Sequence, residues 1–115
     1  MAIYSLQLAD QIRTHLKQFP KLIVEEKKMF RGLTFMVNGK MCLTVSGENL
    51  MCRFDPVKQD EVERKKGFLP MIMKGKKYTG YCYVSPNGFA GKEFDYWMAL
   101  CLDFNEKAKS YKKKQ

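Results

Sequence analysis

Side chains capable of acid–base or nucleophilic chemistry are scattered along this chain of 115 residues. Glu25 and Glu26 are adjacent, but neighbouring residues of a strand point to opposite faces, so the two carboxylates would not work as a pair. The single histidine, His15, follows a helical pattern, and no motif ties a serine, cysteine or carboxylate to it. We interpret it as an ordinary histidine at the boundary of the core, and the sequence predicts no catalytic residue.

The four cysteines show no C-x-x-C spacing, and the histidine is distant from them in sequence. A zinc or iron–sulfur site would need such a spacing or a nearby histidine. Three of the cysteines fall in expected strands and one in an expected helix, where cysteine acts as a small apolar residue. We therefore expect structural thiols, no metal and no cofactor, at Cys42, Cys52, Cys82 and Cys101.

The formal charge of +9 permits attraction to nucleic acid, to acidic proteins or to anionic membranes. Lysines gather in the turn at residues 74–77, which lacks the G-x-x-x-x-G-K-[ST] spacing of a phosphate-binding loop, and again at residues 112–114. Tyr81 and Tyr83 alternate onto one face of an expected strand, where exposed rings could stack on bases. The candidate binding surface consists of Arg53, Lys74, Lys76, Lys77, Tyr81 and Tyr83.

The stretch that organises the chain is the predicted hairpin over residues 29–45, which turns at Asn38-Gly39. A two-residue turn would leave both faces mixed, whereas a three-residue loop that includes Val37 opposes Phe35 to Met41. The second register buries a whole apolar face, worth several kcal/mol at about 25 cal/mol per Å². We expect this register, with Gly39 left-handed. Its apolar face consists of Leu33, Phe35, Met41, Leu43 and Val45.

The other elements follow from apolar periodicity and from capping residues. We expect helices over 6–19, with Ser5 as N-cap, over 56–66, with Asp55 as N-cap, and over 92–110. Further strands are expected at 22–29, 50–54, 68–73 and 78–85, which gives the order α-ββββ-α-ββ-α. In the last helix Trp97 is expected to anchor the buried stripe, and Leu100 and Leu102 widen its apolar surface. The chain reads as one domain, residues 1–110, followed by a basic tail, 111–115.

Four stretches of the sequence resemble the N-terminal domain of the TfoX/Sxy competence-regulator family. They read KKMFRGLTFMVNGKMCLTV, NLMCRFDP, MKGKKYTGYCYV and FDYWMALCLDFNEKAKSYKKK, and together they span nearly the whole chain. The resemblance implies an α+β fold of two layers, like that of secretion chaperones, with helices packed on one face of an antiparallel sheet. It implies no catalytic residues. Full-length relatives regulate DNA-uptake genes and carry a second, C-terminal domain.

No apolar stretch is long enough to cross a membrane, and the polar, amphipathic start does not resemble a secretory signal. We therefore expect a cytoplasmic, non-enzymatic module that binds a protein partner, without membrane contact. Self-association as a homodimer, through the last helix or a strand edge, is one form of this. Nucleic-acid binding is the alternative. An enzyme is the third interpretation, which would need Arg53, Asp55 and Tyr83 to meet in a pocket.

Overall fold

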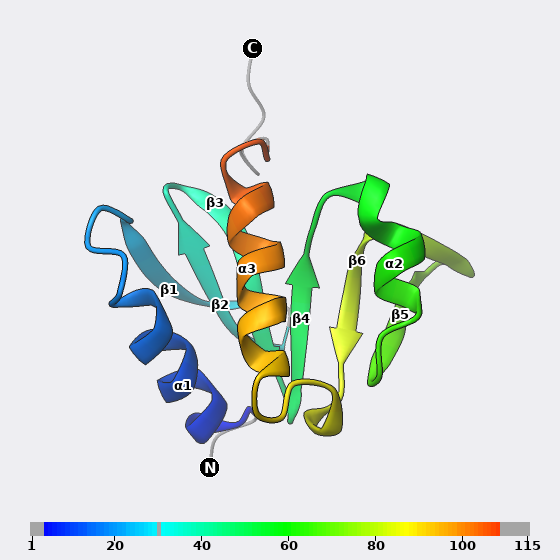
Figure 1. Ribbon diagram of the computed structural model, residues 1–115, viewed down its shortest axis with the longest axis horizontal. Coiled ribbons are helices and arrows are strands. Elements are labelled where there is room, and N and C mark those ends of the chain that lie inside the picture. The colour runs from blue at the N-terminus through cyan, green and yellow to red at the C-terminus, as the bar shows by residue number, and fades with distance from the viewer. Residues whose placement is uncertain (1–3, 30, 109–115) are drawn as a thin grey trace.

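Six strands form one antiparallel sheet in the computed structural model, which describes residues 4–29 and 31–108 (Figure 1). The spatial order is β1-β2-β3-β4-β6-β5, so that β1 and β5 are the two edges. The strands are β1 (Val24–Met29), β2 (Gly32–Val37), β3 (Lys40–Ser46), β4 (Asn49–Arg53), β5 (Phe68–Met73) and β6 (Lys76–Val84). The predicted order α-ββββ-α-ββ-α is confirmed. The predicted tail, 111–115, lies outside the described residues.

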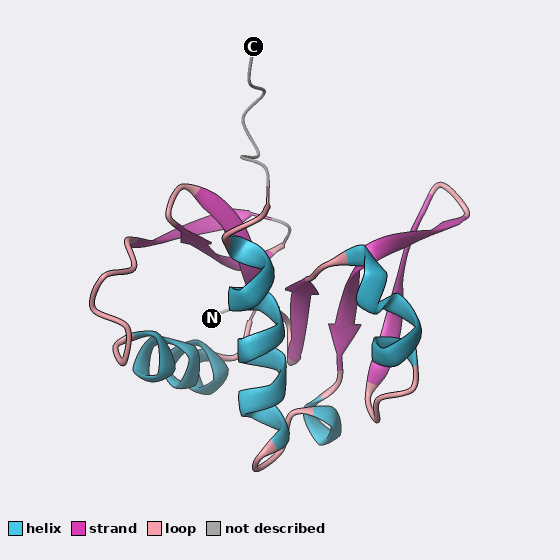
Figure 2. Ribbon diagram, turned by 45° about the horizontal axis from the view of Figure 1, so that its top comes forward, coloured by secondary structure: helices cyan, strands magenta, loops and turns pink. Residues whose placement is uncertain are grey.

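The helices pack against one face of this sheet and make the second layer (Figures 1 and 2). They are α1 (Leu6–Leu16), the 3₁₀ turn η1 (Pro56–Lys58), α2 (Gln59–Glu63), the 3₁₀ turn η2 (Pro86–Gly88) and α3 (Glu93–Asn105). Ser5 caps α1, its Oγ accepting a hydrogen bond from Leu8 N at 3.1 Å, and Asp55 caps η1 in the same way through Val57 N at 3.1 Å. Both predicted N-caps are confirmed, although each helix is shorter than predicted.

The predicted register of the central hairpin is wrong, although Gly39 is left-handed as expected. Asn38 and Gly39 form a two-residue turn, both with positive φ (53° and 80°), and Val37 pairs with Lys40. The register then shifts by one residue, so that Met36 pairs with Met41 but Phe35 with Leu43. Cys42 is the extra residue of this β-bulge.

This bulge does what the three-residue loop was predicted to do, because it returns Leu43 to the face of Phe35. It also reverses two predicted positions. Cys42 joins the core beneath the helices, and Met41 leaves it for the opposite face.

The core between helices and sheet is built around Trp97, Phe35 and Leu43, each fully buried as predicted. Trp97 Nε1 donates to Gly88 O at 2.9 Å, so its polar atom is satisfied. Asn105, the last residue of α3, is also buried, and its Nδ2 donates to Val37 O at 3.1 Å. This bond ties the end of the long helix to the tip of the central hairpin.

Two loops meet backbone to backbone at Gly67 and Gly88. A Cβ on Gly67 would lie 2.5 Å from Gly88 Cα, and one on Gly88 would lie 2.4 Å from Lys66 O. Ser85 N donates to Gly67 O at 2.9 Å across the same contact. The loop before β5 and the loop before α3 are therefore joined at a place where neither admits a side chain.

Candidate binding site: a methionine-lined face of the sheet

The face of the sheet opposite the helices carries no helix in the described part of the chain. It has its own apolar cluster, made only of strand residues: Met36, Met41, Met51 and Met71, with Met29, Tyr81 and Tyr83 packed against them. Every methionine that the structure describes lies on this face except Met98, which belongs to the core under the helices. We call this surface the methionine face.

Strand pleating explains how one sequence makes two apolar faces. Directly paired residues share a face, so the registers place one row across the sheet that runs from β1 to β5. Its members are Lys27, Thr34, Thr44, Met51, Tyr83 and Leu69. Thr34 and Thr44 are fully buried, and their hydroxyls share a hydrogen bond of 2.8 Å. This pair satisfies the polar groups in the middle of the row.

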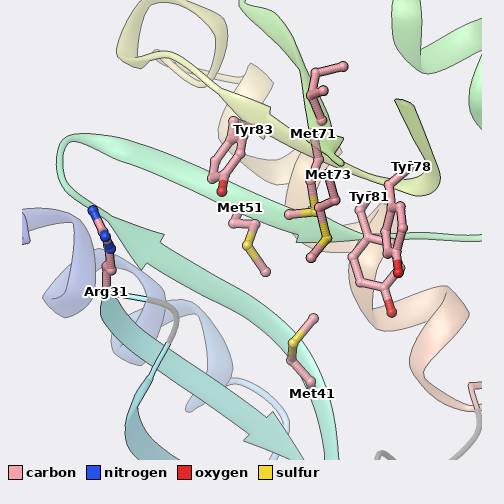
Figure 3. A pocket seen from close by; sticks show the side chains of 9 residues that line it. Arg31, Met41, Met51, Met71, Met73, Tyr78, Tyr81 and Tyr83 are labelled. Carbon is pink, nitrogen blue, oxygen red and sulfur yellow. The ribbon is translucent and has the colours of Figure 1, made fainter. Parts of the chain in front are cut away.

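A cavity of about 420 Å³ opens on the methionine face (Figure 3). Methionines from β3, β4 and β5 point into it, with tyrosines of β6 along its side. Its lining consists of Arg31, Met41, Met51, Met71, Ile72, Met73, Tyr78, Tyr81 and Tyr83. This volume lies in the range of small-ligand pockets and of the pockets that receive anchoring side chains.

An irregularity in the β5–β6 hairpin brings an additional tyrosine into the cavity. Pro70 pairs with Cys82 but Ile72 pairs with Lys77, so β6 carries extra residues at this point. Gly80 sits in this segment with φ of 90°, and Phe54 N donates to its carbonyl at 2.8 Å. As a result Tyr78 and Tyr81 both line the cavity, with ring centroids 5.6 Å apart.

Positive charge surrounds the cavity. Arg31, which has a left-handed backbone with φ of 59°, lines the end away from Tyr78 and Tyr81 (Figure 3). Arg53 Nη1 donates to Met41 O at 3.2 Å, and its guanidinium lies between two rings, 6.0 Å from the centroid of Tyr81 and 5.7 Å from that of Phe104 in α3. Lys27 lies on the same face by register. Among the described strand residues, Glu25, paired with Met36, is the one carboxylate on this face.

The structure brings together half of the predicted binding surface. Arg53, Tyr81 and Tyr83 meet on the methionine face, as the alternation of β4 and β6 predicts. Lys74, with φ of 53°, is at the turn of the β5–β6 hairpin, and Lys76 pairs with Met73. Both lysines are exposed.

Lys77 does not join this surface. Its Nζ contacts Glu63 of α2 at 2.6 Å, on the helix side of the sheet. Hydrogen bonds from Gln59 and then from Lys77 lower the pKa of Glu63. Lys77 therefore fastens α2 to β6.

Sequence reasoning missed the methionines of the site, and also Arg31 and Tyr78. A usable signal was present, because Met51, Met71 and Met73 occupy alternating positions on expected strands. Met41 was missed because the bulge at Cys42 moves it to the other face.

Groups with catalytic potential are engaged elsewhere. His15 is packed between Phe19 and Phe94, and its Nδ1 lies 3.7 Å from an Asp95 oxygen. Asp55 pairs with Lys107 at 2.9 Å on the helix side of the sheet, whereas Tyr83 lines the cavity on the other side. The cluster of Arg53, Asp55 and Tyr83 considered above does not assemble.

All four cysteines are free and buried in the core. Cys52 contacts the thiols of Cys82 and Cys101, and burial raises the pKa of Cys42 and Cys52. Within residues 4–29 and 31–108, no group of three or more His, Cys, Asp or Glu is arranged to hold a metal ion. Over the same residues, no helix has the length and apolar character needed to cross a bilayer.

Comparison with known proteins places the chain in a family. The model of the TfoX N-terminal domain matches residues 15–105, from the end of α1 to the last residue of α3, so it includes every strand and the whole cavity. Searches of curated proteins and of solved structures returned no match. The match covers most of the sequence and the complete sheet. The chain belongs to the TfoX N-terminal domain family.

Proposed function

We propose that this domain is a non-enzymatic regulatory module that binds another protein through the methionine face. The observation that carries the proposal is that the face combines an apolar cavity of about 420 Å³ with the lack of a covering helix in the described chain. A concave apolar surface of this kind marks an interaction site in soluble proteins. Membership in a competence-regulator-like family supports a regulatory role.

Methionine suits such a site because its unbranched thioether side chain adapts to different shapes. Methionine-rich surfaces are used by proteins that accommodate several partners. Ile72, Met73 and Tyr78 are 55%, 48% and 45% exposed, so solvent reaches large apolar groups at the mouth of the cavity. Their removal from water would drive association.

The flank of α3 is less available for association. Leu100 is buried and Leu102 is partly buried against the core, so both contribute to the domain itself. A homodimer through this helix would have little free apolar surface there. The methionine face offers more exposed apolar surface for association than this helix does.

Nucleic-acid binding has one observation in its favour, the tilted pair of Tyr78 and Tyr81 beside the basic hairpin turn. The packing of Tyr81 and Tyr83 against methionines favours a protein partner, since a base-stacking platform presents its rings to solvent. A titration with single- and double-stranded oligonucleotides at moderate salt separates the two. Salt-dependent binding that is lost in Tyr78→Ala would support the nucleic-acid function instead.

The experiment for protein binding is photo-crosslinking in cells, with benzoylphenylalanine in place of Tyr78. Val57, in η1 and 82% exposed, carries the same probe as a control on the helix side. We expect a discrete crosslinked product from position 78, none from position 57, and loss of the product when Met73→Glu is added. The same products from both positions, or none from position 78, would contradict the proposal.

A further inference from the structure

We infer that the partner segment on the methionine face is an amphipathic α-helix that carries acidic residues beside its apolar side. The inference rests on the proposed function and specifies the partner. It follows from three properties of the face: its hydrogen bonding, its shape and its charge.

Hydrogen bonding favours a helix over an extended segment. The cavity floor is formed by β3, β4 and β6, whose backbone groups are already paired within the sheet. The neighbouring edge, β5, contains Pro70, which has no N–H to donate to an added strand. An extended peptide on this face would leave its own backbone groups unpaired, whereas a helix satisfies them internally.

The shape of the site suits the side chains of a helix. The methionines and tyrosines surround a single hollow instead of a row of separate pockets along one strand (Figure 3). Apolar residues at i, i+3 and i+4 of a helix project together and can enter one hollow, which is the usual way a helix occupies a groove. The flexible lining of Met41, Met51 and Met73 adapts to them.

Charge selects an acidic partner. Lys27 and Arg31 lie on the face, Arg53 lies at its border between Tyr81 and Phe104 of α3, and Lys74 and Lys76 lie on the adjoining hairpin. Among the described strand residues, Glu25 is the one carboxylate on this face. Acidic residues flanking the apolar stripe of the partner would meet this excess of positive charge. A second copy of the chain would present the same excess, within a formal charge of +9, and would be repelled.

The test uses the full chain labelled with ¹³C at the methionine methyl groups. The probe is a synthetic helical peptide of about 18 residues made of Leu, Ala and Glu, long enough to form a helix. One analogue replaces Glu with Lys, and another has a central proline that breaks the helix. We expect the acidic peptide to shift the methyl signals of Met41, Met51 and Met73, and to leave that of Met98, buried under the helices, unchanged.

Two variants show whether the shifts report this site. Arg31→Asp reverses a charge at the cavity with a residue that tolerates positive φ, and it should weaken binding of the acidic peptide by about fivefold. Val57→Glu adds a carboxylate on the helix side and should leave the affinity unchanged. Equal effects of the two variants would overturn the assignment of the peptide to this face.

The other outcomes separate this inference from the proposed function. Equal binding of the Lys analogue overturns the acidic character of the partner, and equal binding of the proline analogue overturns its helical form. No methyl shifts with any peptide, together with a product from the crosslinking at position 78, overturns the inference and leaves protein binding in place. A dimer in light scattering that Met73→Glu abolishes would make a second copy the occupant. Shifts caused only by anionic vesicles or by oligonucleotides would overturn both proposals.

Discussion

On one face of the sheet, Phe35, Leu43 and Val45 are sealed beneath helices; on the other, Met36, Met41 and Met51 lie under no helix of the described chain. Both sets belong to the same strands and both are almost fully buried. They differ in the stiffness of their side chains. The three residues beneath the helices are branched or aromatic, and the three on the open face are flexible methionines.

Burial alone does not distinguish the core of this domain from its open face. Met36 is 6% exposed and Phe35 is 0% exposed, yet only Phe35 touches the helical layer. The methionines are buried because they pack against one another and against Tyr81 and Tyr83. These four methionines are shielded from water while the domain is alone, and their flexible side chains can be rearranged when a partner arrives.

Truncation of adjacent residues on the two faces gives the largest expected effect. Phe35→Ala leaves a cavity that the packed helices cannot fill, and should lower the free energy of unfolding by about 3–5 kcal/mol. Met36→Ala should cost about 2 kcal/mol, because neighbouring methionines can move into the space. Urea denaturation measures both. Equal losses would mean that the methionine face is packed as rigidly as the core.

Removal of the Asn105 amide should have the next largest effect on the helix-covered face. Asn105→Ala leaves the buried carbonyl of Val37 without its donor, which should cost about 1–3 kcal/mol. Asp103→Ala, on the exposed side of α3, is the matched control and should be close to neutral. Thermal unfolding of the two variants measures the difference. Similar melting temperatures would show that the hydrogen bond from Asn105 to Val37 contributes nothing to stability.

Gly39→Val tests the turn that sets both faces. Valine resists a φ of 80°, so the turn should be strained by about 1–3 kcal/mol, although no atom lies within 4 Å of an added Cβ. Gly39→Asn, which tolerates positive φ, should be milder. Urea denaturation compares them. An unshifted Gly39→Val protein would contradict the turn geometry.

Acidification should loosen the helix-covered face where α1 meets β1. Arg13 holds Glu26 through two hydrogen bonds of 2.6 and 2.8 Å, which lower the pKa of Glu26 below its usual 4.5. The carboxylate therefore stabilises the folded state fully above pH 4.5, and this stabilisation is lost as the pH falls through the lowered folded pKa.

The exposed pair is worth about 0.2–1 kcal/mol, so Glu26→Gln should lower stability by that amount at pH 7 and by less at pH 3. Glu25→Gln, on the other face, is the control. A pH-independent effect of Glu26→Gln would rule out the ion pair as its cause.

Met73→Glu should have the smallest effect on stability, within about 0.5 kcal/mol, because the side chain is 48% exposed. Its effect on partner binding should be large, because a carboxylate would enter the mouth of the cavity. Binding measured beside urea denaturation tests both parts. A strongly destabilised Met73→Glu protein would place this residue in the core and not at an open site.

Much of the fold could be predicted from local signals. Ser5 and Asp55 predict where helices begin, and Asn38-Gly39 predicts a turn. These signals are reliable because each residue determines the conformation of the backbone next to it. The strand expected at 50–54 is present as β4, and its pairing with β3 places Leu50 and Cys52 beneath the helices.

The bulge at Cys42 could not be predicted in the same way, because nothing local requires an extra residue there. It depends on the combined packing of both faces, and a single residue decides the side on which Met41 lies. The cavity was missed for a related reason. It is formed by residues from four strands and the loop at Arg31, and its concavity depends on how the β5–β6 hairpin bends.

The contact of Gly67 with Gly88 has a consequence for the cavity on the far side of the sheet. This contact joins the start of the β5–β6 hairpin to the loop that leads into α3, and Trp97 Nε1 donates a hydrogen bond to the carbonyl of Gly88. The β5–β6 hairpin supplies Tyr78, Tyr81 and Tyr83 to the lining of the cavity. A methyl group added at either glycine should therefore change the tilt of this hairpin without itself contacting the cavity. Substitutions at positions 67 and 88 should therefore be the first to examine for a change in partner affinity that leaves the residues lining the cavity unaltered.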